Sequence, residues 1–153
     1  MEHGSYKKFA LMLGTSFVIM YGVMYFNVAD TGHIFLSTNR LYMAILMVAP
    51  MALVMLGFMR SMYKNTMLNG AIITLSLLAI GCTFALLRNQ AFVDDEGFMH
   101  SMIPHHSSAI LVSENADLSD PEVKELARKI IEAQREEIAQ MKQILERMDK
   151  HSI

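Results

Sequence analysis

Three uncharged apolar runs in the first 90 residues constrain the fold of this 153-residue chain more than any other feature. They cover residues 9–28, 41–59 and 68–87, and each is flanked by charged or turn-forming residues. A helix needs about 20 apolar residues to cross the roughly 30 Å hydrocarbon core of a bilayer. Buried helices of soluble proteins seldom have such long runs in succession. The sequence therefore predicts an all-α fold that begins with three transmembrane helices in a lipid bilayer.

The charged residues divide the chain into two parts of opposite sign. Residues 1–90 carry six basic and two acidic side chains, whereas residues 91–153 carry seven basic and thirteen acidic ones. We therefore predict a membrane domain over residues 1–90 and a helical-hairpin domain outside the membrane over residues 91–153. This distribution lacks the basic face of a nucleic-acid-binding protein. The single cysteine, Cys82, excludes an intramolecular disulfide and any CxxC site.

The short loops predict the orientation of the chain in the membrane. With three crossings, one side receives Lys7, Lys8, Arg60 and Lys64, and the other receives Arg40 and Arg88. Short cytoplasmic loops carry the excess of basic residues. We therefore expect a multi-pass protein of the plasma (inner) membrane with a cytoplasmic N-terminus and a periplasmic or extracellular C-terminal domain. The first run is too long for a signal peptide and no cleavage site follows it, so a retained anchor is expected.

Five methionines recur at every fourth position of the second run, namely Met43, Met47, Met51, Met55 and Met59. A ladder of thioethers could bind Cu(I). Steps of four residues, however, spread these side chains over about 160° of a regular helix. Because methionine is also a flexible filler of helix contacts, packing is the favoured interpretation.

The C-terminal part reads as two amphipathic helices. Asp94 or Asp95 is the expected N-cap of the first, which runs to about Glu114, and a polar turn follows at residues 115–119. Residues 119–122 have the form of a capping box with a proline near the helix start, and the second helix runs to about Met148 or Asp149. Burying both faces of such a hairpin requires either the membrane portion of the chain or a second chain. We therefore predict a homo-oligomer, most simply a dimer, formed through these C-terminal helices.

Polar residues interrupt the apolar stripes of both helices where an antiparallel hairpin would bring them together. Met102 precedes His105 and His106 by one turn, so it neighbours both on the helix surface, and imidazole with thioether suits copper, especially Cu(I). The predicted metal ligands are Met102, His105 and His106, followed by Met99, His100 and Glu137, with Gln134 and Met141 beside them. Adjacent histidines point about 100° apart on a helix. A histidine–glutamate–glutamine hydrogen-bond cluster without metal therefore remains an open alternative. His33, in the first loop, is expected to be solvated.

No pattern of catalytic residues stands out. A di-iron oxidase needs a Glu-x-x-His pair on facing helices, and no glutamate is followed by histidine three residues later. The HExxH pattern, a Ser–His–Asp set and a glycine-rich phosphate loop are also missing. We therefore expect no enzyme.

The segment FMHSMIPHHSSAI, followed by ELARKIIEAQREEIAQM, resembles the bacterial family called domain of unknown function 305. The family's Met-x-x-His-His and Ala-Ile pattern falls here on Met102, His105, His106, Ala109 and Ile110. Its second pattern falls on Ile130, Ile131, Gln134, Glu137, Ile138 and Met141. The resemblance covers about residues 92–148. The family often has methionine where Val112 stands and tryptophan where Ile144 stands.

The resemblance implies a ferritin-like helical bundle that is exported or membrane-anchored, with a suspected role in copper binding or metal tolerance. The function predicted from the sequence is therefore a bacterial membrane-anchored protein that binds or buffers copper, or confers tolerance to it, through a Met/His site on the hairpin. The alternative is a structural or oligomerising membrane protein whose histidine pair only stabilises the core. The sequence points to no metal-delivery partner.

Overall fold

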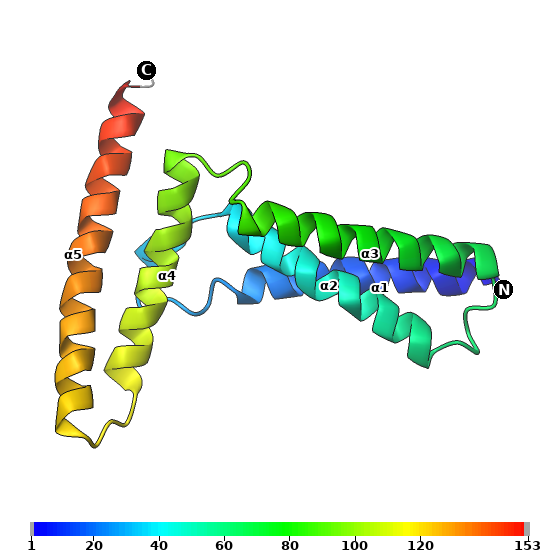
Figure 1. The fold of residues 1–153 in the computed structure, drawn as a ribbon, viewed down its shortest axis with the longest axis horizontal. Helices are drawn as coiled ribbons and strands as arrows, with labels where there is room; N and C mark the ends of the chain where they lie inside the picture. Colours follow the sequence, from blue (N-terminus) through cyan, green and yellow to red (C-terminus); the bar gives the residue numbers. More distant parts are fainter. Residues whose placement is uncertain (1, 152–153) are drawn as a thin grey trace. The chain divides into compact units, whose positions relative to one another are not determined.

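The computed structural model describes residues 2–151 of the chain and the side chains of residues 4–150. It contains five α-helices and one short 3-10 helix, and the described residues form no strand (Figure 1). The elements are α1 (Glu2–Val23), η1 (Thr31–His33), α2 (Thr38–Phe58), α3 (Thr66–Arg88), α4 (Asp95–Asn115) and α5 (Pro121–His151). The prediction of an all-α fold is therefore confirmed.

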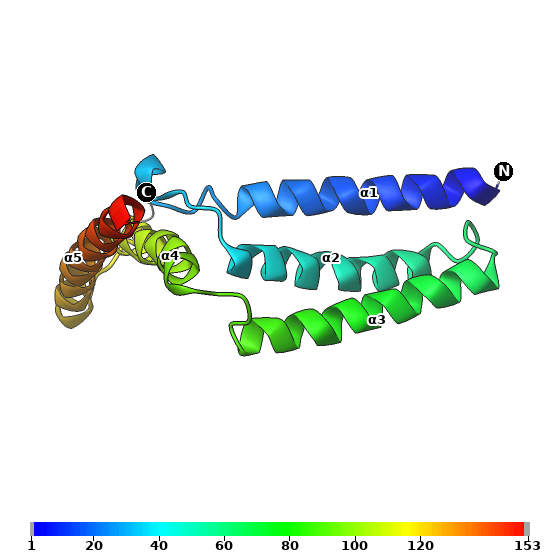
Figure 2. The ribbon, with the colours of Figure 1, turned by 90° about the horizontal axis from the view of Figure 1, so that it is seen from above.

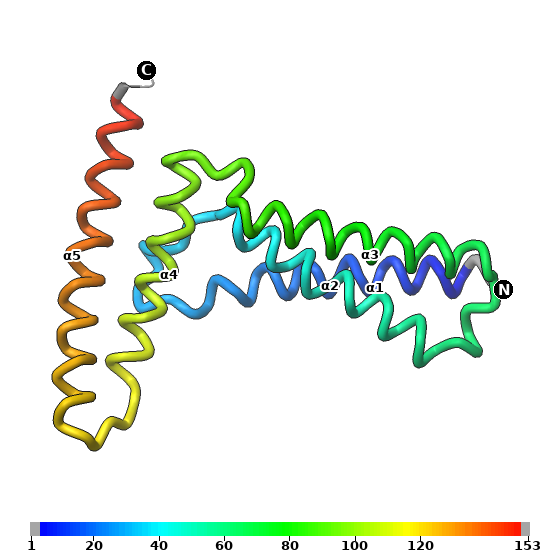
Figure 3. The backbone as a smooth tube through the Cα atoms, in the orientation of Figure 1, coloured from blue at the N-terminus to red at the C-terminus, as the bar shows by residue number. Residues whose placement is uncertain are grey.

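The helices belong to two compact units whose bounds differ from the predicted domains of residues 1–90 and 91–153. Unit 1 comprises Met1–Val23 and Asn39–Phe92, and unit 2 comprises Met24–Thr38 and Val93–Ile153. The tube in Figure 3 can be followed from α1 into the connection that carries η1, back into α2, and later into α4 and α5. The connection between α1 and α2 thus packs with the C-terminal helices, although the sequence placed it in the membrane domain.

Two of the three predicted membrane helices are long and apolar enough to cross a bilayer. By length and composition α2 and α3 both qualify, whereas α1 does not. The prediction for the first run is wrong in its bounds, because α1 includes Lys7 and Lys8 and ends at Val23 instead of Val28. Its apolar part, residues 9–23, is about 22 Å long at 1.5 Å per residue, which is shorter than the roughly 30 Å of hydrocarbon.

In unit 1, the N-terminal half of α1 is fixed to the turn between α2 and α3. The ring of Tyr63 lies 5.2 Å from the rings of both Tyr6 and Phe9. The Tyr6 hydroxyl donates to Asn69 Oδ1 at 2.8 Å and accepts from the backbone N–H of Asn65 at 3.1 Å. Figure 2 shows α1, α2 and α3 running lengthwise next to one another within this unit.

Unit 2 is built on an antiparallel hairpin of α4 and α5 (Figure 1). Asp94 caps α4 by accepting the backbone N–H of Gly97 at 2.8 Å, as its place in the sequence predicts. The shared core consists of Met99, Ile103, Ile110, Ile138, Met141 and Leu145. Each of these side chains is at most 9% exposed, so this seam supplies most of the apolar burial that holds the two helices together.

The second helix begins differently from the expected capping box. The Asp120 carboxylate accepts the backbone N–H groups of Glu122 and Val123 at 2.8 and 3.1 Å. Pro121 is the first residue of α5, where its missing N–H costs nothing. The cap is therefore Asp120, and the predicted Ser119 cap is wrong by one residue.

Replacing Asp120 by alanine should weaken the start of α5 by about 1 kcal/mol, because two backbone N–H groups lose their acceptor. Amide hydrogen exchange of the full chain should then be faster in the first turns of α5. Asp117→Ala is the matched control, since Asp117 is exposed and lies outside the helix. Equal exchange rates in the two variants would contradict the assignment of the cap.

Candidate metal centre

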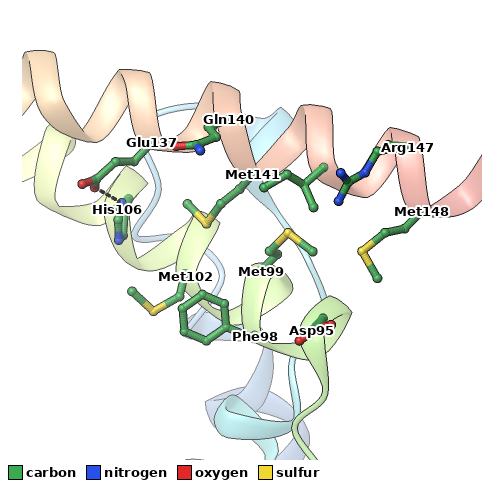
Figure 4. Close-up of a pocket in the computed structure, with 11 residues that line it drawn as sticks. Asp95, Phe98, Met99, Met102, His106, Glu137, Gln140, Met141, Arg147 and Met148 are labelled. Carbon is green, nitrogen blue, oxygen red and sulfur yellow. Dashed lines mark ion pairs between the residues drawn. The ribbon is translucent and has the colours of Figure 1, made fainter.

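The seam between α4 and α5 opens into a pocket of about 440 Å³ within unit 2. Its lining includes four methionines, Met99, Met102, Met141 and Met148, together with His106 and Glu137. The wall is completed by Asp95, Phe98, Gln140, Ile144 and Arg147. Figure 4 shows the side chains of Met99, Met102 and Met141 between the two helices, with the His106–Glu137 pair at one end. The pocket therefore combines soft sulfur ligands with one imidazole.

His106 is the polar centre of this pocket. Its side chain is 12% exposed, and its Nδ1 lies 3.0 Å from Glu137 Oε2. Although this is an ion-pair distance, the two groups are not aligned as a hydrogen bond, and buried Nδ1 has no hydrogen-bond partner among the described residues. Burial lowers the pKa of His106, and His105 lowers it further, while Glu137 raises it and only partly offsets these effects. The imidazole is therefore neutral near pH 7, which is the form that binds a metal.

The remaining predicted ligands lie on other faces of α4. His105 is exposed and does not line the pocket. The rings of His105 and His106 are 6.1 Å apart and inclined by 62°, as expected for neighbours on a helix. His100 stacks on Phe35 at 4.8 Å, and its Nε2 lies 3.8 Å from Glu96 Oε1. The structure thus brings Met99, Met102 and His106 together at the pocket. His100 and His105 do not line it.

On α5, the predicted polar residues form a short chain beside the pocket. Gln134 Nε2 donates to Glu137 Oε2 at 3.4 Å, the same oxygen that faces His106. Glu137 is half exposed, and its carboxylate lies next to the neutral imidazole. Carboxylates in this position orient metal-bound histidines in many proteins, and they equally stabilise histidines that bind no metal.

The composition of the pocket decides which ions it could hold. Among the described residues, no three side chains of the His, Cys, Asp and Glu types meet in an arrangement that could hold a metal ion. Any ion at this place would depend on thioethers, which favour Cu(I) over Zn²⁺, Mg²⁺ or Ca²⁺. The ligand types present are therefore those that a soft ion such as Cu(I) prefers.

The sequence missed one pocket methionine and one polar cluster. Met148 lines the pocket from the same face of α5 as Met141, about two turns further along the helix. Its place in the sequence as a late residue of the apolar stripe gave the only signal. On the other side of α4, the Oγ of fully buried Ser107 accepts the Ala29 N–H at 2.8 Å and lies 2.9 Å from His33 Nδ1. His33 is thus half-buried, so its expected solvation is wrong.

Comparison with known proteins identifies the family to which the chain belongs. Residues 94–152 match the family model described as Domain of unknown function (DUF305). Over 139 residues, the chain is 37% identical to an uncharacterized protein of Acanthamoeba polyphaga mimivirus. This match covers 89% of the present chain and 90% of the viral protein. The chain belongs to the same family as this viral protein and carries a DUF305 domain. The DUF305 match confirms the resemblance of the C-terminal part to this domain. No solved structure matches the chain.

Acidification should destabilise unit 2 through His33. Burial lowers the pKa of His33 and Lys142 lowers it further, whereas Asp30 raises it. Between the folded pKa and the ordinary value of about 6.5, the unfolded chain binds more protons, so the free energy of unfolding falls as the pH falls through this range. Urea unfolding of the full chain in detergent, followed by circular dichroism at about pH 7.5 and 5.5, measures this change.

His33→Asn should reduce that pH dependence, because asparagine does not titrate and still offers a hydrogen-bonding group to Ser107. An unchanged difference between the two pH values in this variant would show that His33 does not contribute.

Proposed function

We propose that the chain is a membrane-anchored copper-binding protein whose DUF305 hairpin holds Cu(I) for buffering or tolerance. The observation that carries the proposal is the pocket in which four methionines meet the neutral imidazole of His106. Thioether and imidazole ligands suit Cu(I) and leave harder cations poorly bound. His105 and His100 belong to the proposal only as ligands that would need a second chain or a side-chain movement.

Support for a membrane location comes from the side chains that unit 1 exposes. The buried positions of α2 and α3 are mostly small or hydroxylated, including Ala44, Ala52, Ser76 and Thr83. Large apolar side chains face outward, among them Val54, Phe58, Met67, Leu75, Leu78 and Phe84, each more than half exposed. Small residues at contacts and large apolar residues outside are typical of helices packed in lipid.

We place α1 in the membrane beside α2 and α3, although its apolar part is short. Its first turns contact the turn after α2, through Tyr6 and Phe9, and its last residue leads into the connection just before α2. If α2 crosses the bilayer, α1 therefore traverses the same depth in the opposite direction. Lys7 and Lys8 can extend toward the headgroups and compensate for the missing length.

The division into units supports the placement of both stretches of unit 2 on the same side of the membrane. Met24–Thr38 precedes α2 and Val93–Ile153 follows α3, so a pair of crossings returns the chain to the side from which it left. The four basic residues on the opposite side favour a cytoplasmic N-terminus. The C-terminal unit then lies in the periplasm or outside the cell. Only the family resemblance supports the bacterial inner membrane as the membrane in question.

A homo-oligomer built on the hairpin would provide the missing half of a ferritin-like four-helix bundle. Phe98, Val112, Val123 and Leu126 are apolar residues of α4 and α5, and each is at least 45% exposed. A second hairpin could cover them and complete the bundle.

The second candidate function is structural. The chain of Gln134, Glu137 and His106 is also what a polar cluster that only stabilises a bundle would contain. Here the pocket would bind no ion, and the role of the hairpin would be assembly.

Replacing His106 by alanine should weaken Cu(I) binding by the full-length protein by about tenfold or more, because a ligand is lost. Competition with a chromophoric Cu(I) chelator measures the affinity. His105→Ala is the matched control and should bind nearly as well as the original chain, since His105 lies outside the pocket. Met102→Leu, which keeps the volume and removes the sulfur, should also bind more weakly. Absence of Cu(I) binding in the original chain would favour the structural function.

The orientation can be read by cysteine labelling in intact cells, using Cys82→Ser as the background. An impermeant thiol reagent should reach Lys150→Cys from outside, whereas Ser61→Cys and Lys8→Cys should react only after the membrane is opened. Both Ser61 and Lys8 are exposed residues at the opposite end of the proposed spans. Labelling of Lys8→Cys together with Lys150→Cys would show that α1 does not cross.

A further inference from the structure

Unit 1 contains a second cavity, of about 520 Å³, where α2 ends and α3 begins. Its lining is Leu53, Leu56, Gly57, Arg60, Tyr63, Lys64, Thr66, Asn69 and Ile73. Basic and polar groups lie at the helix ends, and aliphatic side chains lie along the helices. The cavity therefore has one charged end and one apolar wall.

Among the described side chains of unit 1, no acidic group balances the positive charge of this cavity. Arg60 and Lys64 are both exposed, and none of the ion pairs among the described side chains involves them. Glu2, whose side chain is outside the described part, is the only acidic residue in the sequence of the unit. Two cations that line one cavity and have no carboxylate partner among the described side chains favour an anion as their ligand.

The floor of the cavity is fixed. Tyr63 is 3% exposed and packs against the rings of Tyr6 and Phe9. Asn69 is held by the Tyr6 hydroxyl and donates to the Tyr63 carbonyl at 2.8 Å. These contacts fix the turn between α2 and α3 and the start of α3, which form the base of the hollow.

Gly57 keeps the apolar wall open. A Cβ atom built on Gly57 meets no heavy atom within 4 Å. Leu53 and Ile73 stand along the same wall, and Ile73 is 43% exposed. An acyl chain could therefore lie along α2 and α3 below the charged end.

We propose that this cavity binds one anionic glycerophospholipid, with its phosphate at Arg60 and Lys64 and an acyl chain along Leu53 and Ile73. The proposal rests on the membrane placement of α2 and α3 proposed above, which puts residues 60–64 at the headgroup level. An arginine offers a planar pair of donors to a phosphate and a lysine adds a compact charge. The combination of a charged rim and an aliphatic wall fits a lipid better than a free phosphate, which would use the rim only.

The test uses the full chain in a neutral detergent, with native mass spectrometry to count retained lipids. Phosphatidylglycerol should be retained in preference to phosphatidylcholine, at one molecule per chain. The double variant Arg60→Gln, Lys64→Gln should lose roughly 30-fold in apparent affinity for phosphatidylglycerol. The control Lys7→Gln, Lys8→Gln removes the same charge outside the cavity and should lose much less.

A second pair of variants tests the acyl-chain wall. Gly57→Leu should fill the hollow and reduce retention, whereas Gly70→Leu should not, because Gly70 has the same open surroundings but does not line the cavity. Inorganic phosphate at matched concentration should not displace the lipid. Equal retention of the two lipids, equal losses in the two lysine-containing double variants, or displacement by phosphate would overturn the proposal.

Alkaline extraction of membranes keeps this result separate from the proposed membrane location. A chain that leaves the membrane at high pH refutes the placement of α2 and α3 and, with it, the lipid site. A chain that stays in the membrane but shows no preference for phosphatidylglycerol refutes only the lipid site.

Discussion

The contact between α4 and α5 is the interaction on which the rest of unit 2 depends. Ile103 is fully buried, and Met99 and Ile138 are nearly so, which fixes the two helices against each other. Met99 and Met141 belong both to this seam and to the wall of the pocket, so the packing of the two helices also positions the pocket. The pocket therefore takes its shape from apolar packing, and its polar members, His106 and Glu137, add chemistry to a site that they do not hold together.

The sequence predicted the helices whose signals are local. Long apolar runs located α2 and α3, and the Asp94 cap located the start of α4. It failed for the end of α1 at Val23 and for the assignment of residues 24–38. The Ala29–Ser107 hydrogen bond joins residues 78 positions apart, and a serine in a helix gives no local sign of such a partner.

The candidate site was predicted in part, for a related reason. In a helix with a single buried face, such as α5, the apolar stripe shows which residues face inward. Met141 was therefore placed correctly beside the pocket. In α4, one face packs on α5 while another, with Ser107, packs on the connection between α1 and α2. The stripe of α4 contained His106 with His105 at its edge, and both were predicted as ligands, although only His106 lines the pocket. Two buried faces blur the stripe, so the pattern did not show that Ser107 packs on the connection.

The participation of Met24–Thr38 in unit 2 makes the folding unit larger than the segment that the family model matches. A hairpin separated from this connection would lose the partners of Ser107 and the Phe35 ring that stacks on His100. Unit 2 is therefore built from two separate stretches of the chain. Because α2 and α3 lie between these two stretches in the sequence, a version of unit 2 made without them would need a linker from residue 38 to residue 93.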